Sequence, residues 1–312
     1  MAIATHIIKS GFLPVGDGHN LYYEQWGNQN AAPIFYLHGG PGSGFSDGNK
    51  LLFDPAKHHV IFHDQRGSGR STPSASLEQN TTQNLIEDIN KLAEHLRIDS
   101  FIVVGGSWGS TLSLLYAIAN PKRVQKLVVW SICLVRKFET DYVNGGYPRY
   151  SFPEAWERFI SFVPEKHRTN GDKIMEYYAQ QIRSTEKNTA SKFAGEWILW
   201  EASLLSKNYD QRRLEAEILS IDTLPMAMLE THYFLNNCFI PENYILDNIT
   251  KIQHIPAFIV HGRFDFCTPP IAARDLAKAY GKSSILQWTN AGHLRTDPEN
   301  FVVLKAIINA IA

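Results

Sequence analysis

The sequence has 312 residues, 44% of them hydrophobic and 20% charged, which is typical of a globular protein with a large buried core. Its 30 Lys and Arg against 31 Asp and Glu leave a formal net charge of -1, so composition gives no electrostatic reason to expect nucleic acid or an anionic membrane as partner. No apolar run approaches the roughly 20 residues that a membrane span requires.

The N-terminal residues 1–12 lack a basic region followed by an apolar core, so no secretory signal is predicted. The sequence holds three cysteines, Cys133, Cys238 and Cys267, an odd number without the spacing of metal ligands. We therefore expect free thiols, no bound metal and a reducing, cytoplasmic environment.

The first part of the chain alternates short apolar runs with amphipathic helical patterns. In residues 82–97, leucines and isoleucines recur at spacings of four, three and four, which predicts a helix with one apolar face, and residues 110–120 form a second helical pattern that ends at Pro121. Runs that are apolar on both faces are typical of buried parallel strands. The predicted strands are Ile34–Leu37, Val60–His63, Phe101–Val104 and Leu127–Trp130.

The alternation lapses at residue 137 and returns after residue 249. The intervening segment is rich in aromatic residues and helical in pattern, with no clear strand, whereas strands at 258–261 and 285–288 and a helix at 299–311 follow it. We therefore predict an α/β fold with a mostly parallel sheet flanked by helices. Residues 1–136 and 250–312 would form this core, and residues 137–249 an inserted helical cap.

The sequence Gly-Gly-Ser-Trp-Gly at residues 105–109 lies between a predicted strand and a predicted helix. This context is what a nucleophile elbow requires, because the turn is too tight for side chains two positions before and after the serine. The turn lifts the serine hydroxyl clear of the sheet, above a helix N-terminus. The alternative, a glycine-rich turn with an incidental serine, does not explain the flanking elements. Ser107 is therefore the candidate nucleophile.

A serine nucleophile needs a base and an acid that orients the base. Asp265 and His293 each follow a predicted strand, in the chain order Ser, acid, His that this architecture uses. Asp265 lies 158 positions after Ser107, and His293 lies 28 positions after Asp265. Alone, a loop Asp is usually a turn or helix cap and a lone His usually a surface residue. Their joint placement favours catalytic roles for both.

Two glycine-rich loops follow the first strands. The loop His-Gly-Gly-Pro-Gly at residues 38–42 would let its backbone approach a substrate, and we expect the N–H groups of Gly40 and Trp108 to form the oxyanion hole, although a plain tight turn is the alternative. The loop at residues 64–71 is rich in Gly and Ser but lacks the Gly-Lys-Ser/Thr ending of a phosphate-binding loop. A structural loop beside the site is the better interpretation.

Taken together, these motifs resemble those of the proline iminopeptidases (prolyl aminopeptidases), serine peptidases of the α/β-hydrolase superfamily. The likeness extends over residues 10–132 and 255–298 and includes Gly-Arg-Phe-Asp at residues 262–265, where Phe264 stands in place of the family's usual Tyr. The resemblance implies a cytoplasmic, metal-free and cofactor-free enzyme that releases N-terminal proline from short peptides through an acyl-enzyme.

In that family the cap selects the substrate, with carboxylates for the free amine and aromatic side chains around the ring. By resemblance these would be Glu201 and Glu230 for the amine and Phe234 for the ring, with Tyr142 and Tyr150 as further candidates for the ring pocket. A protonated amine in an apolar pocket requires a paired anion, which agrees with this assignment. The resemblance also suggests that the thiol of Cys267 lies near the site.

Other functions remain open on the same fold. An amidase or aminopeptidase of broader specificity and a small-ester hydrolase would use the same catalytic residues, and a non-catalytic ligand receptor could keep the pocket. Epoxide and halide chemistry is disfavoured, because those relatives have Asp at the nucleophile position where this chain has Ser107.

Overall fold

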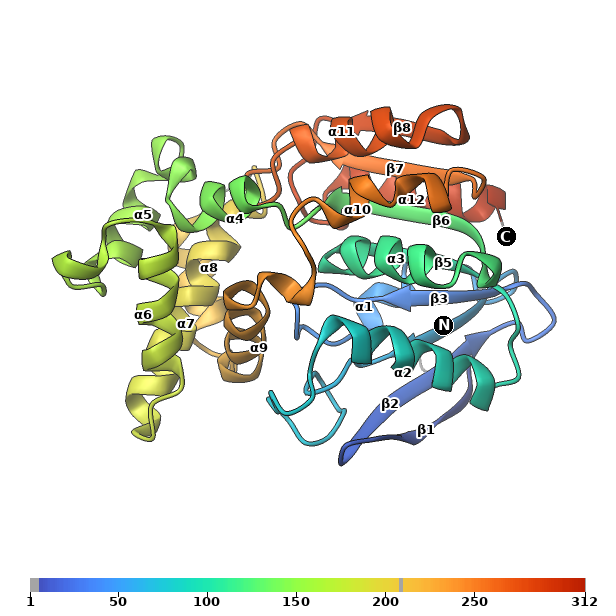
Figure 1. Ribbon diagram of the computed structural model, residues 1–312, viewed down its shortest axis with the longest axis horizontal. Helices are drawn as coiled ribbons and strands as arrows, with labels where there is room; N and C mark the ends of the chain where they lie inside the picture. Colours follow the sequence, from blue (N-terminus) through green and yellow to red (C-terminus); the bar gives the residue numbers. More distant parts are fainter. Residues whose placement is uncertain (1–5, 208–209, 312) are drawn as a thin grey trace.

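The computed structural model describes residues 6–207 and 210–311. Parts of the predicted domains, residues 1–5 and 312 of the core and 208–209 of the cap, therefore lie outside the described residues. The described chain forms an eight-stranded sheet in the order β1-β2-β4-β3-β5-β6-β7-β8 (Figure 1). Its strands are β1 (Ile7–Gly16), β2 (His19–Gly27), β3 (Pro33–Leu37), β4 (His59–His63), β5 (Phe101–Ser107), β6 (Val124–Ile132), β7 (Ala257–Gly262) and β8 (Ser284–Thr289).

The sheet confirms the predicted α/β fold class. From β4 to β8 the neighbouring strands pair in parallel, as expected for short runs that are apolar on both faces. The antiparallel strands β1 and β2 were not predicted from the sequence. β1 is largely exposed, so it lacks the continuous apolar run by which the buried strands are recognised.

Helices cover both faces of the sheet, giving the layered arrangement expected for alternating strands and helices. Alternate residues along β5 separate the two cores: Phe101 and Val103 pack in the cluster with α2, α3 and α11, whereas Ile102 and Val104 pack in the cluster with α12. The helices of this core are α1 (Asp47–Lys50), α2 (Thr82–His95), α3 (Trp108–Ala119), α10 (Tyr244–Asp247), α11 (Ile271–Tyr280) and α12 (Pro298–Ile311).

The remaining helices gather beside one end of the sheet (Figure 1). They enclose a hydrophobic cluster of their own, in which Phe159 stacks on Tyr178 with ring centroids 4.4 Å apart. After α9 the chain rejoins the core, because Ile245 and Ile249 pack in the cluster beneath α2 and α3. The helices of this block are α4 (Lys137–Asn144), α5 (Pro153–Ser161), α6 (Gly171–Ile182), α7 (Lys187–Leu204), α8 (Gln211–Ile218) and α9 (Leu224–Leu235).

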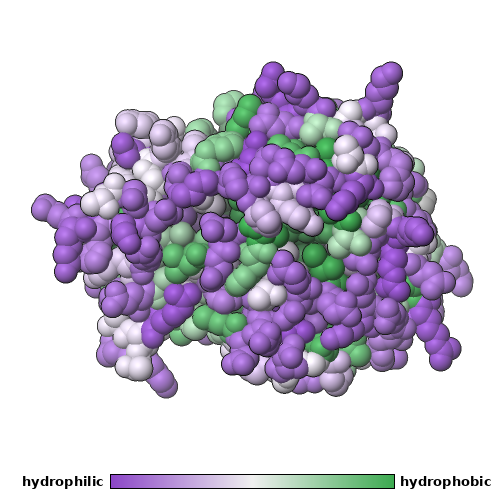
Figure 2. All heavy atoms as spheres, in the orientation of Figure 1, coloured by the Kyte–Doolittle hydropathy of each residue, from purple (hydrophilic) through white to green (hydrophobic). Residues whose placement is uncertain are grey.

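The surface is predominantly hydrophilic on the face shown in Figure 2, and most of the hydrophobic colour lies in the middle of this face, between the helical block and the sheet core. Among the described helices, none combines the length and the apolar character that crossing a membrane demands.

Candidate active site

Ser107 ends β5 and directly precedes α3, which is the strand–turn–helix junction that its motif predicts. Its backbone has φ 57° and ψ -130°, a region that non-glycine residues rarely adopt and that is typical of strained functional sites. The flanking glycines explain the turn: a Cβ on Gly105 would lie 2.4 Å from the carbonyl oxygen of Gly109, and one on Gly109 would lie 2.1 Å from that of Leu37. Any side chain at either position would therefore open the elbow.

Asp265 and His293 come together at the ends of β7 and β8. The Nδ1–H of His293 donates to Asp265 Oδ1 at 3.0 Å and Oδ2 at 2.9 Å, and both side chains are buried. The carboxylate also accepts from the backbone N–H groups of Cys267 and Thr268, at 3.0 and 2.8 Å, and from the Thr268 hydroxyl at 2.8 Å. Because the carboxylate engages Nδ1, the ring leaves Nε2 available as a proton acceptor.

These contacts set the protonation of the pair. Burial acts to raise the pKa of Asp265, but the charge and hydrogen bond of His293 outweigh it and the pKa is lowered. For His293, burial acts to lower the pKa, whereas Asp265 and then the more distant Glu201 raise it, and the net pKa is raised above 6.5. An ionised acid beside a base that gains a proton readily is what general-base catalysis by a Ser-His-Asp set requires.

The loop after β3 lies directly against the nucleophile. A Cβ on Gly39 would lie 3.4 Å from the Cβ of Ser107, and Gly40, with φ 103°, lines the same cavity as Ser107 and Trp108. Two further contacts hold this loop. The Gln65 backbone N–H donates to His38 Nε2 at 2.9 Å, and the Trp108 indole N–H donates to Gln65 Oε1 at 3.0 Å. The backbone groups expected to bind an oxyanion are thus on neighbouring, anchored segments.

The second glycine-rich loop is occupied by its own side chains. The Asp64 carboxylate accepts from the backbone N–H groups of Phe45 at 2.7 Å and Arg70 at 2.9 Å. Arg66 forms a buried two-bond ion pair with Asp88, at 2.6 and 2.9 Å. Because the internal carboxylates take the donors that a phosphate would need, the contacts agree with a structural loop.

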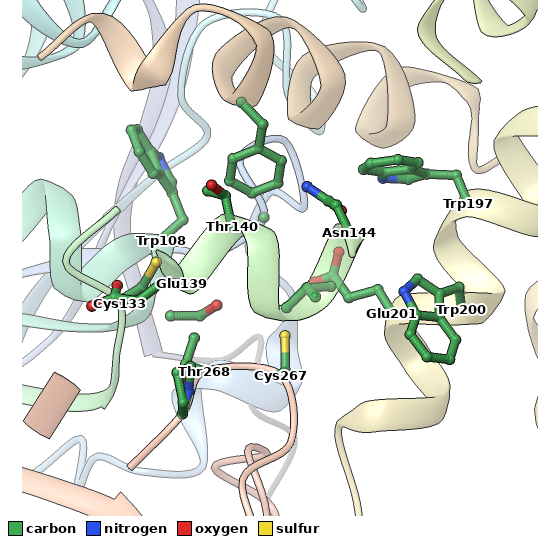
Figure 3. A pocket seen from close by; sticks show the side chains of 15 residues that line it. Trp108, Cys133, Glu139, Thr140, Asn144, Trp197, Trp200, Glu201, Cys267 and Thr268 are labelled. Atoms are coloured by element: carbon green, nitrogen blue, oxygen red, sulfur yellow. The ribbon is translucent and has the colours of Figure 1, made fainter. Parts of the chain in front are cut away.

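A cavity of about 690 Å³, measured out to its mouth, opens above Ser107 between the core and the helical block (Figure 3). Its wall is mostly apolar with a few polar groups, the usual character of a small-molecule site. The core contributes Gly40, Ser107, Trp108, Cys133, Cys267, Thr268 and Pro269, and the helical block contributes Glu139, Thr140, Val143, Asn144, Trp197, Trp200, Glu201 and Phe234.

Glu201 and Glu230 form an acidic pair at this cavity. Glu201 lines the wall, and Glu230, fully buried behind it, accepts from the indole N–H of Trp197 at 2.8 Å. Burial raises the pKa of both carboxyls, and the neighbouring charge of Glu201 raises that of Glu230 well above its ordinary value. The other oxygen of Glu230, Oε1, is buried without a hydrogen-bond partner. Because its raised pKa favours a protonated Glu230, the pair offers a cation the charge of Glu201, and a second negative charge when the proton of Glu230 leaves.

Of the aromatic residues named from the resemblance, Phe234 lines the cavity and the two tyrosines do not. Tyr142 stacks on Tyr147 instead, with ring centroids 6.1 Å apart. Tyr150 is 78% exposed, and its hydroxyl accepts from Arg149 at 3.1 Å. Tyr150 is thus turned to solvent, whereas Tyr142 lies on α4, the helix whose Thr140 and Val143 line the cavity, so its place near the ring stays a prediction.

Sequence reasoning missed several residues of the wall. Trp197 and Trp200 stand in the motif that identified Glu201, and the spacing of four residues from Trp197 to Glu201 on a helix was a usable signal. The indole nitrogen of Trp200 is buried without a hydrogen-bond partner and faces the side of Glu201 (Figure 3). Asn144 and Thr140 come from α4, whose sequence carries no marker of a site.

The cysteines are unpaired, and Cys133 and Cys267 line the cavity. Burial raises the pKa of both thiols, so neither has the character of an activated nucleophile. Within residues 6–207 and 210–311, no three His, Cys, Asp or Glu side chains are grouped so as to hold a metal ion.

Solved structures of other proteins share the fold of this chain. An esterase from Exiguobacterium antarcticum superimposes with a TM-score of 0.67 at 17% identity over 97% of this chain and 99% of its own. A proline iminopeptidase from Mycobacterium smegmatis gives a TM-score of 0.62 at 18% identity over 97% of each chain. At such low identity these likenesses show the fold alone.

Sequence comparison is more specific. The family described as "alpha/beta hydrolase fold" matches residues 32–295. A proline iminopeptidase from Arabidopsis thaliana is 41% identical over 93% of this chain and 76% of its own length, and one from Neisseria meningitidis serogroup A is 40% identical over 97% and 94%. The chain therefore belongs to the α/β-hydrolase family and, within it, to the proline iminopeptidases.

Proposed function

We propose that the protein is a serine aminopeptidase that releases proline from the N-terminus of short peptides. The observation that carries the proposal is the acidic pair at the cavity that contains Ser107, in which half-buried Glu201 lines the wall and buried Glu230 lies behind it. A free N-terminal amine lies a fixed distance from the first carbonyl of a peptide. Carboxyls and a nucleophile that meet in one cavity can therefore select the first peptide bond and exclude internal ones.

The proposed chemistry assigns Ser107, His293 and Asp265 the roles of nucleophile, base and acid. Ser107 Oγ attacks the prolyl carbonyl carbon while its proton passes to His293 Nε2, and Asp265 stabilises the imidazolium that forms. The backbone N–H groups of Gly40 and Trp108 bind the oxyanion. As the C–N bond breaks, His293 returns the proton to the leaving amine. Water then hydrolyses the prolyl-enzyme by the same route and releases free proline.

Recognition of the substrate is assigned to the helical block. The secondary ammonium of an N-terminal proline pairs with Glu201 and Glu230, and its binding favours loss of the proton that the raised pKa of Glu230 retains. Trp197, Trp200 and Phe234 supply apolar wall for the pyrrolidine ring. The unpaired thiols of the described chain agree with a cytoplasmic location.

A small-ester hydrolase is the alternative on this fold, and it would use the same three catalytic residues. The acidic pair disfavours it, because a buried carboxyl beside a half-buried one costs free energy that a neutral ester does not recover. Relatives named proline iminopeptidase, at 41% and 40% identity, support the aminopeptidase.

Two substitutions test the proposal on a chromogenic prolyl amide. Ser107→Ala is expected to abolish proline release. Glu201→Gln is expected to raise KM by about 10- to 100-fold with a smaller effect on kcat, because it removes the anion that pairs with the substrate's ammonium.

A matched control lies on the same helix as Glu201. Glu196 is also a buried carboxylate of α7, but it pairs with Arg158 at 2.6 and 2.8 Å and is absent from the wall of the cavity. Glu196→Gln should leave KM unchanged. Equal KM values for the Glu201 and Glu196 variants would remove the proposed role of Glu201, and a wild-type enzyme that ignores prolyl amides would remove the proposed function.

A further inference from the structure

The loop that carries His293 is held on its core side by buried side chains. The Ser131 hydroxyl donates to the carbonyl of His293 at 2.6 Å, and the backbone N–H of Gly292 donates to Asp297 at 2.6 Å. Asn300 donates to the carbonyl of Gly292 at 3.0 Å. None of these contacts fixes the backbone N–H of His293 itself.

That N–H donates to the helical block. Its acceptor is the carbonyl of Leu205, the C-terminal cap residue of α7, at 2.8 Å. Two residues further on, the ammonium of Lys207 donates to the carbonyl of Asn290 at 2.7 Å. The segment 205–207 thus contacts both ends of the loop 290–293.

The two segments also approach each other closely. A Cβ on Gly292 would lie 2.8 Å from the carbonyl oxygen of Leu205 and 3.2 Å from the Cα of Ser206, so the loop can lie here only with glycine at this position. The contact begins one turn of helix beyond Glu201, on the helix that also places Trp197 and Trp200 in the cavity wall. One element therefore touches both the substrate pocket and the loop of the general base.

We propose that the segment 205–207 positions the catalytic histidine, so that the helix that recognises the substrate's amine also sets the reach of the base toward Ser107. The inference rests on the proposed catalytic role of His293 and assigns Leu205, through its carbonyl, as a positioning residue. Any displacement of the C-terminal end of α7 would move His293 as well. An empty or distorted substrate pocket would therefore slow the attack by Ser107.

The test is a pair of variants at Ser206. Proline at position 206 disfavours the helical conformation of the preceding residue, and Leu205 has φ -79° and ψ -27°, so Ser206→Pro turns the Leu205 carbonyl away from His293. Ser206→Ala removes the same side chain and leaves that backbone conformation allowed. Both variants are compared in the rate at which a fluorophosphonate probe labels Ser107 and in turnover of a neutral p-nitrophenyl ester.

The proposal predicts that Ser206→Pro slows both labelling and ester turnover by about tenfold, the scale of a small misplacement of a catalytic group. Its KM for a prolyl amide should stay within about twofold of the wild-type value, since the groups that bind the amine are unchanged. Ser206→Ala should match the wild type. Unchanged labelling in a folded Ser206→Pro variant, or an equal loss in Ser206→Ala, would overturn the proposal.

If melting curves show that Ser206→Pro does not fold, the labelling rate of Lys207→Met tests the proposal instead. Its control is Lys126→Met, which removes another lysine-to-carbonyl hydrogen bond, made to Ile311 at 2.6 Å. A labelling rate of Lys207→Met about threefold below that of the control supports the proposal. The expected loss is modest because the side chain of Lys207 is exposed. Equal rates overturn it. Since labelling and ester turnover need no proline, these outcomes are independent of whether wild type cleaves prolyl amides.

Discussion

At the scale of single residues, the proposed mechanism depends on the protonation of His293. Its imidazole must be neutral to accept the proton of Ser107, and its pKa is raised above 6.5, with burial opposing and the charges of Asp265 and Glu201 prevailing. Activity is therefore lost as pH falls through this raised pKa, and the acid limb of kcat/KM should have its midpoint above pH 6.5. A neutral ester is the appropriate substrate, because it does not titrate.

The pH profile of kcat/KM can be checked with a second variant. Glu201→Gln removes one of the charges that raise the pKa of His293, so the acid limb should move to lower pH, whereas Glu196→Gln should leave it in place. A wild-type midpoint below 6.5, or a limb that does not move in Glu201→Gln, would contradict the electrostatic account of the base.

Glu230 illustrates a cost of function at a single residue. Its folded-state pKa is raised well above 4.5 by burial and by Glu201, so the stability associated with its proton is present at pH below about 4.5 and is lost as pH rises. Glu230→Gln should therefore raise the melting temperature at pH 8 by about 2–4 °C, with the gain disappearing near pH 4. The amide oxygen can still accept from Trp197.

Calorimetry at the two pH values measures this prediction, with the KM for a prolyl amide expected to rise in the same variant. A melting temperature that falls at pH 8 would show that the Glu230 carboxylate stabilises the fold.

The candidate catalytic residues could be predicted from the sequence alone, but the full set of residues that form the cavity wall could not. Ser107, Asp265 and His293 follow strands in a fixed chain order, so local pattern and topology together predicted that they would meet. The cavity wall depends on how the helices of the inserted block pack, which no local pattern encodes. This is why Tyr150 was expected in a wall that Asn144 and Trp200 occupy instead.

At the scale of elements, the elbow depends on contacts that leave no space for a side chain. A methyl group at Gly109 would lie 2.1 Å from the carbonyl oxygen of Leu37, so Gly109→Ala must separate α3 from β3. We expect a loss of at least about 2 kcal/mol in the free energy of unfolding, measured by urea denaturation, together with loss of probe labelling.

Gly11→Ala is the control for this loss, because its Cβ would lie 3.5 Å from the nearest atom of Tyr23, an ordinary contact. It should change the free energy of unfolding by less than about 0.5 kcal/mol. Equal stability of the two variants would mean that the elbow tolerates a side chain and that its glycines are not structurally required.

The strands of the sheet differ in how easily they can be predicted from the sequence. Buried strands such as β5 are apolar on both faces and stood out, whereas β1 pairs at an exposed edge and has no such signature. The block was expected to be helical as a whole, but its two eight-residue helices, α4 and α8, were not predicted individually; α8 has no buried residue and few apolar ones.

At the scale of the whole molecule, the proposed function assigns hydrolysis to the core and the choice of substrate to the helical block. The candidate nucleophile, acid and base come from strand ends, and the acidic pair comes from α7 and α9. The cavity lies between the two parts, so neither alone determines the reaction. The division at residues 137–249 remains a prediction, and α10 within it packs on the core.

The central claim is that the cavity selects an N-terminal proline with a free, protonated amine. The most direct measurement is kcat/KM for a panel of naphthylamides, in which prolyl, alanyl and N-acetylprolyl substrates are compared with a neutral acetyl ester. The prolyl amide should be preferred over the other substrates. Acetylation of its amine should remove turnover, since the ammonium that pairs with Glu201 and Glu230 is then lost. Turnover of the ester and of the N-acetylprolyl amide with no advantage for the free prolyl amide would contradict the claim.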